Sequence, residues 1–567
     1  MAEKPKTVVI VGGVAGGASA AARLRRLDET ANIIILERTG YVSYANCGLP
    51  YYIGGAIKDR DRLTLQTPQS FRERFNVDVR VNSEAASIDR AAKSVHVRDL
   101  KGGGEYDLSY DALILSPGAR AVKPRIPGID GERIFTLRNV ENTFAIDDFI
   151  RDARPASAVV VGAGFIGMEM AENLVKRGLK VTVVDKLDHV MPTLDADMAA
   201  LVQNQMYDEG VLFRKSAGVT GFAAREGGVE VDLDDGYAPL EADMAILAIG
   251  VEPESDLAAA CGLELGVRGA IKVDDRMRTN DPAIYAVGDA VQVKNRITGE
   301  DVAIPLAGPA NKQGRIAADN ICGIESTYKG SIGSSVMKFF NLTIASCGLS
   351  TRAAEQAGID FDFVITNPTQ HATYYPGAQY FMLKVLYERG TKRIIGAQAV
   401  GPDGVDKRMD VLAVAIAQGM TADDLVDLEL CYAPPYGAAK DPVNMIGYVI
   451  QNITDGLVET APWSVVENPP ENSMLVDVRS KKEFSQDHLD GAVNIDVDGM
   501  REKLPDLDPS VTYHIYCQVG IRGYIATRIL TQNGFKAKNL QGGYSFYNAV
   551  DYASWRKEAT SACGMPV

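Results

Sequence analysis

Two cysteine-containing loops carry the residues that could handle sulfur chemistry. The first is Ser43-Tyr44-Ala45-Asn46-Cys47-Gly48-Leu49-Pro50-Tyr51-Tyr52, and the next cysteine after Cys47 is the distant Cys261. A lone thiol can enter redox chemistry only with a sulfur partner. We therefore expect this partner to arrive on a small molecule, as a mixed disulfide or a persulfide.

The second loop is Cys517-Gln518-Val519-Gly520-Ile521-Arg522-Gly523, which follows an expected strand over residues 513–516. Such a loop turns successive backbone N–H groups toward the cysteine sulfur and begins a helix behind it. Both features stabilise a thiolate or a persulfide anion. Arg522 adds a fixed positive charge suited to an anionic sulfur donor. Cys517 and Arg522 are therefore predicted to be catalytic.

A Rossmann-type unit is expected just before the first loop. An apolar strand from Thr7 leads into the glycine turn 12–17 and a helix over 18–27, and a second strand, 33–36, ends in Glu37. In such a unit the helix N-terminus faces a pyrophosphate and the acid binds a ribose. The glycine pattern is degenerate because Val14 holds its middle position, but the surrounding strand, helix and acid support the prediction.

A second unit of the same kind has a more regular pattern. The strand 158–161 leads into Gly162-Ala163-Gly164-Phe165-Ile166-Gly167 and a helix, and the strand 181–184 ends in Asp185. A carboxylate at that position binds a ribose 2′-hydroxyl and repels a 2′-phosphate, which favours NADH over NADPH. Lys186 follows directly and keeps NADPH possible.

The composition narrows the class of protein. A chain of 567 residues is expected to hold about three to four domains. The net charge of −15 argues against nucleic-acid binding. The seven cysteines, Cys563 among them, show neither disulfide-framework nor zinc-like spacing, so we expect no metal site and a reducing, cytoplasmic location. The sequence contains no run of eighteen apolar residues, so we expect no membrane span.

The order of the motifs resembles the pyridine nucleotide-disulfide reductase superfamily. Ser116-Pro117-Gly118 ends the strand that leaves the first unit, Gly250 has the same place after the second, and the segment 279–289 resembles the second FAD signature, whose terminal aspartate, Asp289, binds the ribityl chain. The resemblance implies an NAD(P)H domain inserted into an FAD domain. The residues expected to bind these cofactors are Gly12, Gly13, Ala15, Gly16, Gly17, Glu37, Arg38, Ser116, Pro117, Gly118, Asp289, Gly162, Gly164, Phe165, Ile166, Gly167, Glu169, Asp185 and Gly250.

Residues 1 to about 450 resemble coenzyme A-disulfide reductase, the single-cysteine branch of this superfamily. The resemblance lies in the segments 12–17, 43–52, 306–315 and 431–440. It implies that Cys47 cycles between a thiol and a mixed disulfide with coenzyme A beside the flavin. It also implies a homodimer in which the partner subunit supplies the catalytic tyrosines Tyr374 and Tyr432. The residues matching substrate contacts are Ser19, Arg23, Arg26, Ser43, Asn46, Asn311 and Lys440.

The C-terminal part resembles a rhodanese domain, and residues 454–473, which contain three prolines, are expected to form the linker into it. The predicted fold class is therefore α/β: two nested Rossmann-like FAD and NAD(P)H domains, an α+β dimerisation domain and an α/β rhodanese domain. The expected boundaries are 1–118 and 249–328 for the FAD domain, 119–248 for the NAD(P)H domain, 329–453 for the dimerisation domain and 472–562 for the rhodanese domain.

Combining the two sulfur loops predicts an NADH-dependent flavoenzyme that reduces coenzyme A persulfide, polysulfide or disulfide at Cys47 while the rhodanese domain handles sulfane sulfur at Cys517. The nearest alternative is a coenzyme A-disulfide reductase for thiol balance with an independent thiosulfate sulfurtransferase. A more distant enzyme option is an NADH oxidase or peroxidase that uses the single cysteine as a sulfenate. A redox-sensing or scaffold role, with flavin bound but not turned over, is the alternative from another class.

Overall fold

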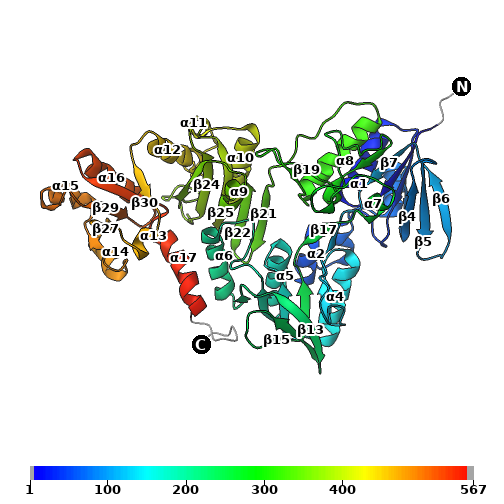
Figure 1. The fold of residues 1–567 in the computed structure, drawn as a ribbon, viewed down its shortest axis with the longest axis horizontal. Coiled ribbons are helices and arrows are strands. Elements are labelled where there is room, and N and C mark those ends of the chain that lie inside the picture. The colour runs from blue at the N-terminus through cyan, green and yellow to red at the C-terminus, as the bar shows by residue number, and fades with distance from the viewer. Residues whose placement is uncertain (1–4, 559–567) are drawn as a thin grey trace. The chain divides into compact units, whose positions relative to one another are not determined.

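The computed structural model describes residues 5–558, which form two compact units (Figure 1). The first unit contains residues 5–188 and 210–333, and the second contains residues 189–209 and 334–558. The end of the predicted rhodanese range, residues 559–562, and Cys563 lie outside the described residues. Among the described residues, none of the helices combines the length and apolar composition that a membrane span needs.

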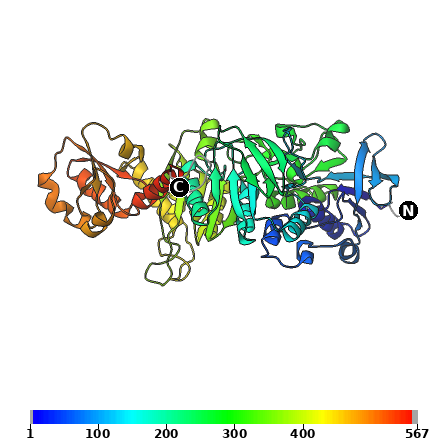
Figure 2. The ribbon, with the colours of Figure 1, turned by 90° about the horizontal axis from the view of Figure 1, so that it is seen from below.

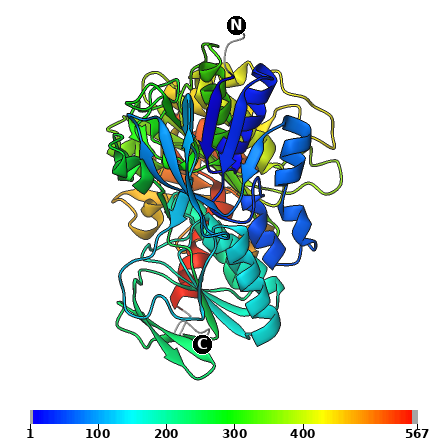
Figure 3. The ribbon, with the colours of Figure 1, turned by 90° about the vertical axis from the view of Figure 1, so that its right-hand side faces the viewer.

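A five-stranded parallel sheet forms the core of the first unit, in the order β18-β7-β1-β2-β3. Four of its strands are near-continuous apolar runs covered on both faces, whereas the edge strand β3 reads Asp-Val-Arg. The helices α1 and α8 pack against each other beside this sheet (Figure 3). The bounds are β1 (Thr7–Val11), β2 (Asn32–Leu36), β3 (Asp78–Arg80), β7 (Ala112–Leu115), β18 (Ile284–Ala286), α1 (Ala15–Leu27), α3 (Pro68–Phe75) and α8 (Ala307–Ile321). A three-stranded antiparallel sheet, β4 (Ser83–Asp89), β5 (Ser94–Asp99) and β6 (Glu105–Ser109), adds a second apolar cluster.

A second parallel sheet of the same unit has the order β12-β11-β10-β16-β9. The paired strands β8 (Ala119–Ala121) and β17 (Val251–Pro253) form the two chain connections between the sheets, so this fold is inserted into the first one as predicted. The bounds are β9 (Ile134–Thr136), β10 (Ser157–Val161), β11 (Lys180–Val184), β12 (Leu212–Arg214), β16 (Met244–Leu247), α4 (Val140–Ala153) and α5 (Phe165–Lys176). A hairpin sheet of β13 (Val219–Arg225), β14 (Gly228–Leu233) and β15 (Leu240–Ala242) covers it.

The second unit begins with a five-stranded antiparallel sheet in the order β21-β22-β25-β24-β23. The strands are β21 (Ser335–Phe339), β22 (Leu342–Gly348), β23 (Phe361–Thr366), β24 (Met382–Glu388) and β25 (Ile394–Gly401). The helices are α9 (Thr351–Gln356), α10 (Val405–Gln418), α11 (Ala422–Val426) and α12 (Pro442–Thr454). Helix α6 (Ala196–Asp208) also belongs to this unit, which the sequence did not reveal.

The C-terminal part of the second unit is a parallel sheet in the order β26-β30-β29-β27-β28, drawn in orange and red in Figure 2. Its strands are β26 (Glu459–Ala461), β27 (Ser473–Asp477), β28 (Val493–Asn494), β29 (Thr512–Tyr516) and β30 (Lys536–Leu540). Its helices are α13 (Ser464–Glu467), α14 (Lys481–Gln486), α15 (Met500–Lys503), α16 (Ile521–Gln532) and α17 (Gly543–Glu558). The expected linker 454–473 is therefore largely structured: it contributes α13 and the edge strand β26, whose backbone pairs with β30.

The side chain of Gln541 connects this C-terminal fold to the antiparallel sheet of its own unit. The side chain of Gln541 accepts a hydrogen bond from the backbone N–H of Ile365 at 2.9 Å and donates one to the carbonyl of Phe363 at 3.2 Å. Both partners lie on β23, the edge strand of that sheet. Helix α17 also packs against α6, where the Asn204 amide donates to the carbonyl of Ala549. The edge strand is thus covered, which removes a site for unwanted strand pairing.

Candidate active sites

A cavity of about 1060 Å³ in the first unit brings together most of the residues predicted for FAD and for the substrate. The predicted residues that line it are Gly12, Ala15, Gly16, Ser19, Glu37, Arg38, Ser43, Asn46, Cys47, Ser116, Pro117, Gly118, Asp289 and Asn311. They come from strand ends, from the loop before α2 (Leu49–Ile53) and from the start of α8. Sequence segments almost 300 residues apart therefore meet at the carboxyl edge of one parallel sheet, where α/β folds place their ligands.

The glycine turn at the cavity has a geometry that only glycine tolerates. Gly12 has φ +93°, and a Cβ there would lie 2.0 Å from the carbonyl oxygen of Ser116. A Cβ at Gly17 would lie 1.9 Å from the carbonyl oxygen of Gly12. The turn therefore holds the start of α1 close to the strand, with its N-terminus free to face a pyrophosphate. The carboxylate of Glu37 accepts a hydrogen bond from Gly13 N at 3.0 Å, at the position expected for the ribose acid.

Cys47 lies in a short 3-10 turn, Asn46–Gly48, directly before α2. The loop is anchored by Ser43, which has φ +49° and donates its backbone N–H to the carbonyl of Gly13 at 2.8 Å. The Cys47 side chain is open to the cavity, while the surrounding walls remove enough water to raise the pKa of its thiol. The carbonyl oxygen of the Asn46 side chain is buried without a hydrogen-bond partner among the described residues. An orphaned acceptor beside a thiol fits a bound ligand.

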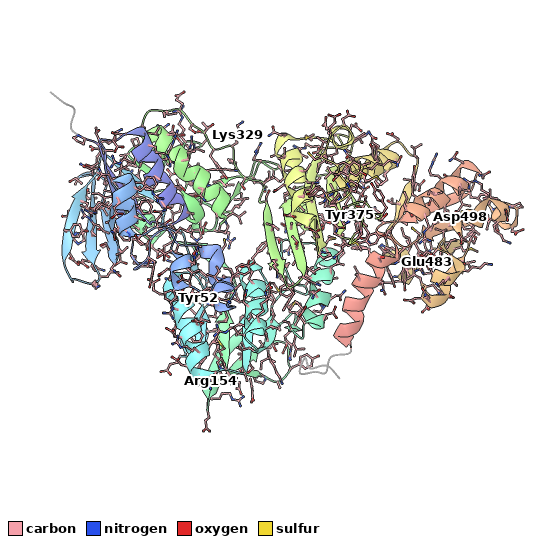
Figure 4. The ribbon with its side chains drawn as sticks, turned by 180° about the vertical axis from the view of Figure 1, so that it is seen from behind. Tyr52, Arg154, Lys329, Tyr375, Glu483 and Asp498 are labelled. Carbon is pink, nitrogen blue, oxygen red and sulfur yellow. The ribbon has the colours of Figure 1, made fainter. Side chains whose placement is uncertain are left out.

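A carboxyl group on helix α5 acts electrostatically on Cys47. Glu169 on α5 accepts a hydrogen bond from the hydroxyl of Tyr51 at 3.2 Å, and burial raises the pKa of Glu169 to about 7. Its charge, together with that of Asp289, raises the pKa of Cys47 further, whereas Arg138 lowers it. Glu169 was predicted as a nicotinamide-cofactor residue, but the involvement of Tyr51 could not be read from the sequence. Tyr52, the next residue on α2, is labelled in Figure 4.

Asp289, the residue expected to contact the ribityl chain, is paired with a cation that sequence analysis missed. The Arg138 guanidinium lies 2.7 Å from Asp289 and also donates to the carbonyl of Ala119 at 2.7 Å. Arg138 precedes α4 and lies 151 positions from Asp289, so no motif connects the two. Arg138 therefore brings a positive charge near the Cys47 thiol, but that charge is shared with Asp289.

The second Rossmann turn repeats the geometry of the first. A Cβ at Gly167 would lie 1.8 Å from the carbonyl oxygen of Gly162, just as a Cβ at Gly17 would lie 1.9 Å from the carbonyl oxygen of Gly12. The carboxylate of Asp185 accepts a hydrogen bond from Ala163 N at 2.6 Å. The predicted residues Gly164, Phe165 and Ile166 begin α5, and Gly250 follows β16. These residues form a dinucleotide turn with the acid at the ribose position, which fits NAD(P)H.

The residues predicted to contact coenzyme A are distributed over both units. In the first unit, the Ser19 hydroxyl lies 2.5 Å from the Asn311 side chain, and both line the Cys47 cavity. Arg23 is ion-paired with Asp319 at 2.7 Å, and Arg26 is exposed on the same helix. Lys440 lies on an exposed loop of the second unit. Ser19 and Asn311 are thus placed with Cys47, whereas Arg23 has a protein partner.

The two predicted catalytic tyrosines meet within the second unit. The hydroxyl groups of Tyr374 and Tyr432 lie 2.5 Å apart, and both side chains are exposed. Their hydrogen bond raises the pKa of Tyr374. The loops that carry them are connected by Ala372 N, which donates to the carbonyl of Gly437 at 2.9 Å. The residue pair spans 58 positions, so the sequence could name the tyrosines only by resemblance.

A buried ion pair supports these two tyrosine loops. Arg408 on α10 is 1% exposed and lies 2.9 Å from Asp441, which is 3% exposed. The same guanidinium donates to the carbonyl of Gln370 at 2.8 Å, in the loop of Tyr374, while Asp441 ends the loop of Tyr432. Because both charges are buried, each depends on the other. Tyr375, beside Tyr374, is labelled in Figure 4.

The second sulfur site is built at the carboxyl end of β29, as predicted. Cys517 is fully buried and its sulfur accepts a hydrogen bond from Gly520 N at 3.1 Å. Gly520 has φ +109°, which turns this N–H inward. The Cys517 carbonyl accepts from Tyr544 N at 2.7 Å, which fixes the loop against the start of α17. One N–H donor on the sulfur supports the predicted stabilisation of an anion.

Each arginine near Cys517 has a carboxylate partner. Arg522 forms a two-pronged ion pair with Glu483 at 2.6 and 2.8 Å. Arg479 is 3% exposed, lies 2.7 Å from the fully buried Asp477, and donates to Gln518 in the Cys517 loop at 3.0 Å. The sequence predicted Arg522 as a fixed positive charge for an anionic sulfur donor, and Glu483 and Arg479 were not predicted as site residues. The Asp-Val-Arg and Glu-Phe segments before the loop were the available signal.

All six cysteines among the described residues are free thiols. Cys47 is therefore a single thiol in its cavity, and Cys517 a single thiol in its loop. Each thiol lies where the sequence placed it, Cys47 beside a dinucleotide turn and Cys517 in a loop at the end of a strand.

Comparisons with known proteins agree with this architecture. Residues 6–314 match the pyridine nucleotide-disulphide oxidoreductase family, residues 334–442 match its dimerisation domain, and residues 464–549 match the rhodanese-like domain. The coenzyme A disulfide reductase of Staphylococcus aureus is 37% identical over 444 residues, which are 78% of this chain and 99% of that protein.

Solved structures extend the similarity to nearly the whole chain. The reduced CoADR-RHD of Bacillus anthracis is 46% identical with a TM-score of 0.93, over 96% of this chain and 98% of that one. The NAD-dependent persulfide reductase of A. fulgidus is 39% identical with a TM-score of 0.90, over 95% and 100%. The water-forming NADH oxidase of Lactobacillus brevis is 29% identical with a TM-score of 0.76, over 80% and 99%.

These matches confirm the predicted fold class and the resemblance that the motifs carried. The family implies FAD and NAD(P)H as cofactors, and the two glycine turns described above fit them. The chain therefore belongs to the pyridine nucleotide-disulphide oxidoreductase family, as a flavin- and NAD(P)H-dependent oxidoreductase of its coenzyme A disulfide reductase branch with a C-terminal rhodanese-like domain.

Proposed function

We propose that the protein uses NADH to reduce coenzyme A persulfide, and also polysulfide and coenzyme A disulfide, at Cys47, while its rhodanese-like domain handles sulfane sulfur at Cys517. The observation that carries this proposal is the single free thiol of Cys47 in the cavity lined by Ser19, Asn46 and Asn311. A thiol with no protein sulfur partner needs one from the substrate.

The proposed reaction at Cys47 is a thiol exchange followed by a reduction. The Cys47 thiolate attacks the coenzyme A sulfur of CoA–S–S–H, so that a Cys47–S–S–CoA bond forms and HS⁻ leaves with the electron pair of the broken bond. When bound, FAD supplies the relay that brings two electrons from NADH. Cleavage of the mixed disulfide then returns the Cys47 thiolate and releases coenzyme A as the second product. With coenzyme A disulfide the first leaving group is coenzyme A thiolate instead.

The tyrosine pair is proposed as the proton donor to the leaving thiolate. The two hydroxyls, 2.5 Å apart, form a short hydrogen bond. One hydroxyl can therefore donate its proton to the leaving thiolate while the other stabilises the resulting phenolate by a hydrogen bond. The exposure of both side chains is consistent with their use on a second copy of the chain, and the dimerisation domain supports a homodimer. We further propose a reducing, cytoplasmic location, which agrees with the free thiols among the described residues.

A second candidate function is thiol balance, with coenzyme A disulfide as the main substrate. The similarity to the Staphylococcus aureus coenzyme A disulfide reductase favours it, since that protein matches 444 residues and 99% of its length without requiring the rhodanese-like part. The presence of a complete Cys517 loop in this chain favours the persulfide. The proposed assignments of individual site residues are the same for both candidates.

Anaerobic NADH oxidation with coenzyme A persulfide and coenzyme A disulfide as parallel acceptors tests the proposal, for the wild type and Cys47→Ser. We expect a markedly higher kcat/KM on the persulfide, lost in Cys47→Ser. A higher value on the disulfide would favour thiol balance. Equal rates in Cys47→Ser and the wild type would reject both. Rapid NADH consumption with oxygen alone would favour an oxidase.

A further inference from the structure

The charges around Cys517 cancel in pairs, which bears on the sulfur donor that this site can accept. Glu483 neutralises Arg522 through two hydrogen bonds, and Asp477 neutralises Arg479. A small dianionic donor such as thiosulfate is repelled by the negative charge of the Cys517 thiolate. It therefore needs a nearby cation whose charge is not already neutralised by an acid. An organic persulfide, R–S–S–H, presents at most one charge at the sulfur that is transferred.

The Glu483 carboxylate is fixed before any donor arrives. It occupies the third position of α14 in a capping box, in which its oxygen accepts hydrogen bonds from Ser480 N at 3.0 Å and Ser480 Oγ at 2.7 Å. The Arg522 guanidinium holds the pKa of Glu483 down at about 2, so the carboxylate stays charged at any neutral pH. Glu483 is labelled on the C-terminal fold in Figure 4.

The residues that flank Arg522 on α16 are apolar at the surface. Ile521 is 53% exposed and Ile525 is 42% exposed, one helical turn apart. Arg522, between them in sequence, has about a third of its side chain exposed and directs its two amino groups to Glu483. The surface next to the Cys517 loop therefore offers aliphatic contact together with a compensated charge.

We propose that Glu483 is a specificity-determining residue of the Cys517 site, which makes this site select organic persulfides over thiosulfate. The inference rests on the sulfur-transfer role proposed above and names its donor class. The step is Cys517–S⁻ + R–S–S–H → Cys517–S–S–H + R–S⁻: the new S–S bond forms at the terminal sulfur, and the old bond leaves its electron pair on the departing thiolate. With thiosulfate the departing group is sulfite.

Sulfur loading of Cys517 without NADH provides the test, because it does not involve the flavin site. The full-length protein with Cys47→Ser is incubated with thiosulfate or with 2-mercaptoethanol persulfide, and mass spectrometry follows persulfide formation at Cys517. In the Cys47→Ser protein with Glu483 unchanged, the organic persulfide should transfer sulfur to Cys517 much faster than thiosulfate does. Equal loading from the two donors would overturn the proposal, whatever the variants do.

The variant Glu483→Gln separates charge from structure, since glutamine also serves in a capping box. We expect thiosulfate loading to rise by roughly tenfold or more when Arg522 is released, and the rise to shrink at high salt, as a charge effect does. Circular dichroism and thermal unfolding of each variant report that the domain is folded. The double variant Glu483→Gln/Arg522→Gln should lose the gain, and Glu502→Gln, which removes an acid from α15, should show none.

A thiosulfate rate unchanged in Glu483→Gln, or a gain that survives removal of Arg522, would overturn the proposal. These outcomes differ from failure of the proposed reductase function, which would appear as absent NADH oxidation with coenzyme A persulfide while Cys517 still loads. The two results are measured with different donors, readouts and cysteines, so one cannot be mistaken for the other.

Discussion

The environments of Cys47 and Cys517 differ in how they affect a negative charge on the cysteine sulfur. Cys47 lies open to a large cavity, and burial together with the charges of Glu169 and Asp289 raises the pKa of its thiol. Cys517 is closed from solvent, receives a backbone N–H at 3.1 Å and has two arginines balanced by two acids. The first environment suits a thiol that forms and breaks a bond to a bound substrate. The second suits a thiol that stores sulfur as a stabilised anion.

The largest contrast is expected at the glycines that shape the two sites. Gly12→Ala places a Cβ 2.0 Å from the carbonyl oxygen of Ser116, so the turn must break and FAD should be lost. Gly520→Ala meets nothing within 4 Å and suffers only from φ +109°, which costs about 1–3 kcal/mol. Flavin absorbance of the purified variants and thermal unfolding check both. Flavin retained at wild-type stoichiometry in Gly12→Ala would show that the turn is not part of the cofactor site.

The buried pair beside Cys517 should dominate the stability of the C-terminal fold. Asp477→Asn leaves the charge of Arg479 buried and uncompensated, which costs about 3–5 kcal/mol. The first unit should keep its flavin, because its core clusters contain neither residue. Asp506→Asn, at an exposed ion pair with Lys503, is the matched control and should change the stability by less than about 1 kcal/mol. Urea unfolding followed by tyrosine fluorescence and flavin release measures both. Similar losses from the two variants would contradict the role of burial.

The tyrosine pair should matter for turnover at Cys47 and little for loading of Cys517. Tyr432→Phe removes one partner of the 2.5 Å hydrogen bond and should lower kcat by about 100-fold or more, since a positioned proton donor typically contributes about 10²- to 10⁴-fold. Tyr436→Phe, on the same loop and 73% exposed, is the control. A steady-state analysis with coenzyme A persulfide measures kcat and KM separately. A fall confined to KM would assign Tyr432 to binding instead.

The Arg408–Asp441 pair allows a further test of that tyrosine site. If the pair positions the loops of Tyr374 and Tyr432, Asp441→Asn should lower kcat, and adding Tyr432→Phe should lower it little more, because both substitutions remove the same proton donor. The double-mutant cycle on kcat is the readout. Additive effects of the two substitutions, with stability accounted for, would reduce the ion pair to a purely structural contact.

The smallest expected effect concerns the pH dependence of Cys47. The pKa of Glu169 is raised to about 7, so this carboxyl gains its charge as the pH rises through that value, and the charge then opposes ionisation of the thiol. Glu169→Gln should therefore lower the pKa of Cys47, whereas Glu132→Gln, an exposed acid of the same unit, should not. The pH dependence of alkylation by iodoacetamide measures it. An unchanged profile in Glu169→Gln would remove Glu169 from the electrostatics of the thiol.

Glu169 also links pH to stability in a defined direction. Its pKa in the folded protein is about 7, above the ordinary value of a glutamate, because burial disfavours the charged form. Its contribution to stability is therefore complete below the ordinary glutamate pKa and is lost as the pH rises through about 7. Between these limits the wild type should lose stability relative to Glu169→Gln as the pH is raised.

The sequence was sufficient wherever a local pattern dictates the chemistry. The glycine turns, the ribose acids Glu37 and Asp185, and the Cys517 loop depend on residues within about twenty-five positions of one another, and the family match confirms the fold that they predicted. The tyrosine pair and the substrate contacts came only from resemblance, and their roles remain predictions.

What the sequence could not supply are the partners that arrive from distant segments. Arg138 meets Asp289 across 151 positions, and Gln541 meets β23 across 176. Charged residues of this kind look like ordinary surface residues until the fold brings them together. The same holds for β26, because a three-residue edge strand leaves almost no sequence pattern and its proline-containing segment resembles a linker.

The proposal that reduction occurs at Cys47 and sulfur loading at Cys517 is tested most directly by one experiment on Cys47→Ser and Cys517→Ser. NADH oxidation with coenzyme A persulfide and persulfide loading at Cys517 are measured on the same preparations. The account predicts that Cys47→Ser loses NADH oxidation and keeps loading, while Cys517→Ser keeps NADH oxidation on coenzyme A persulfide and loses loading. Loss of both activities in either single variant, in a protein that retains its flavin, would contradict two chemically separate sulfur sites.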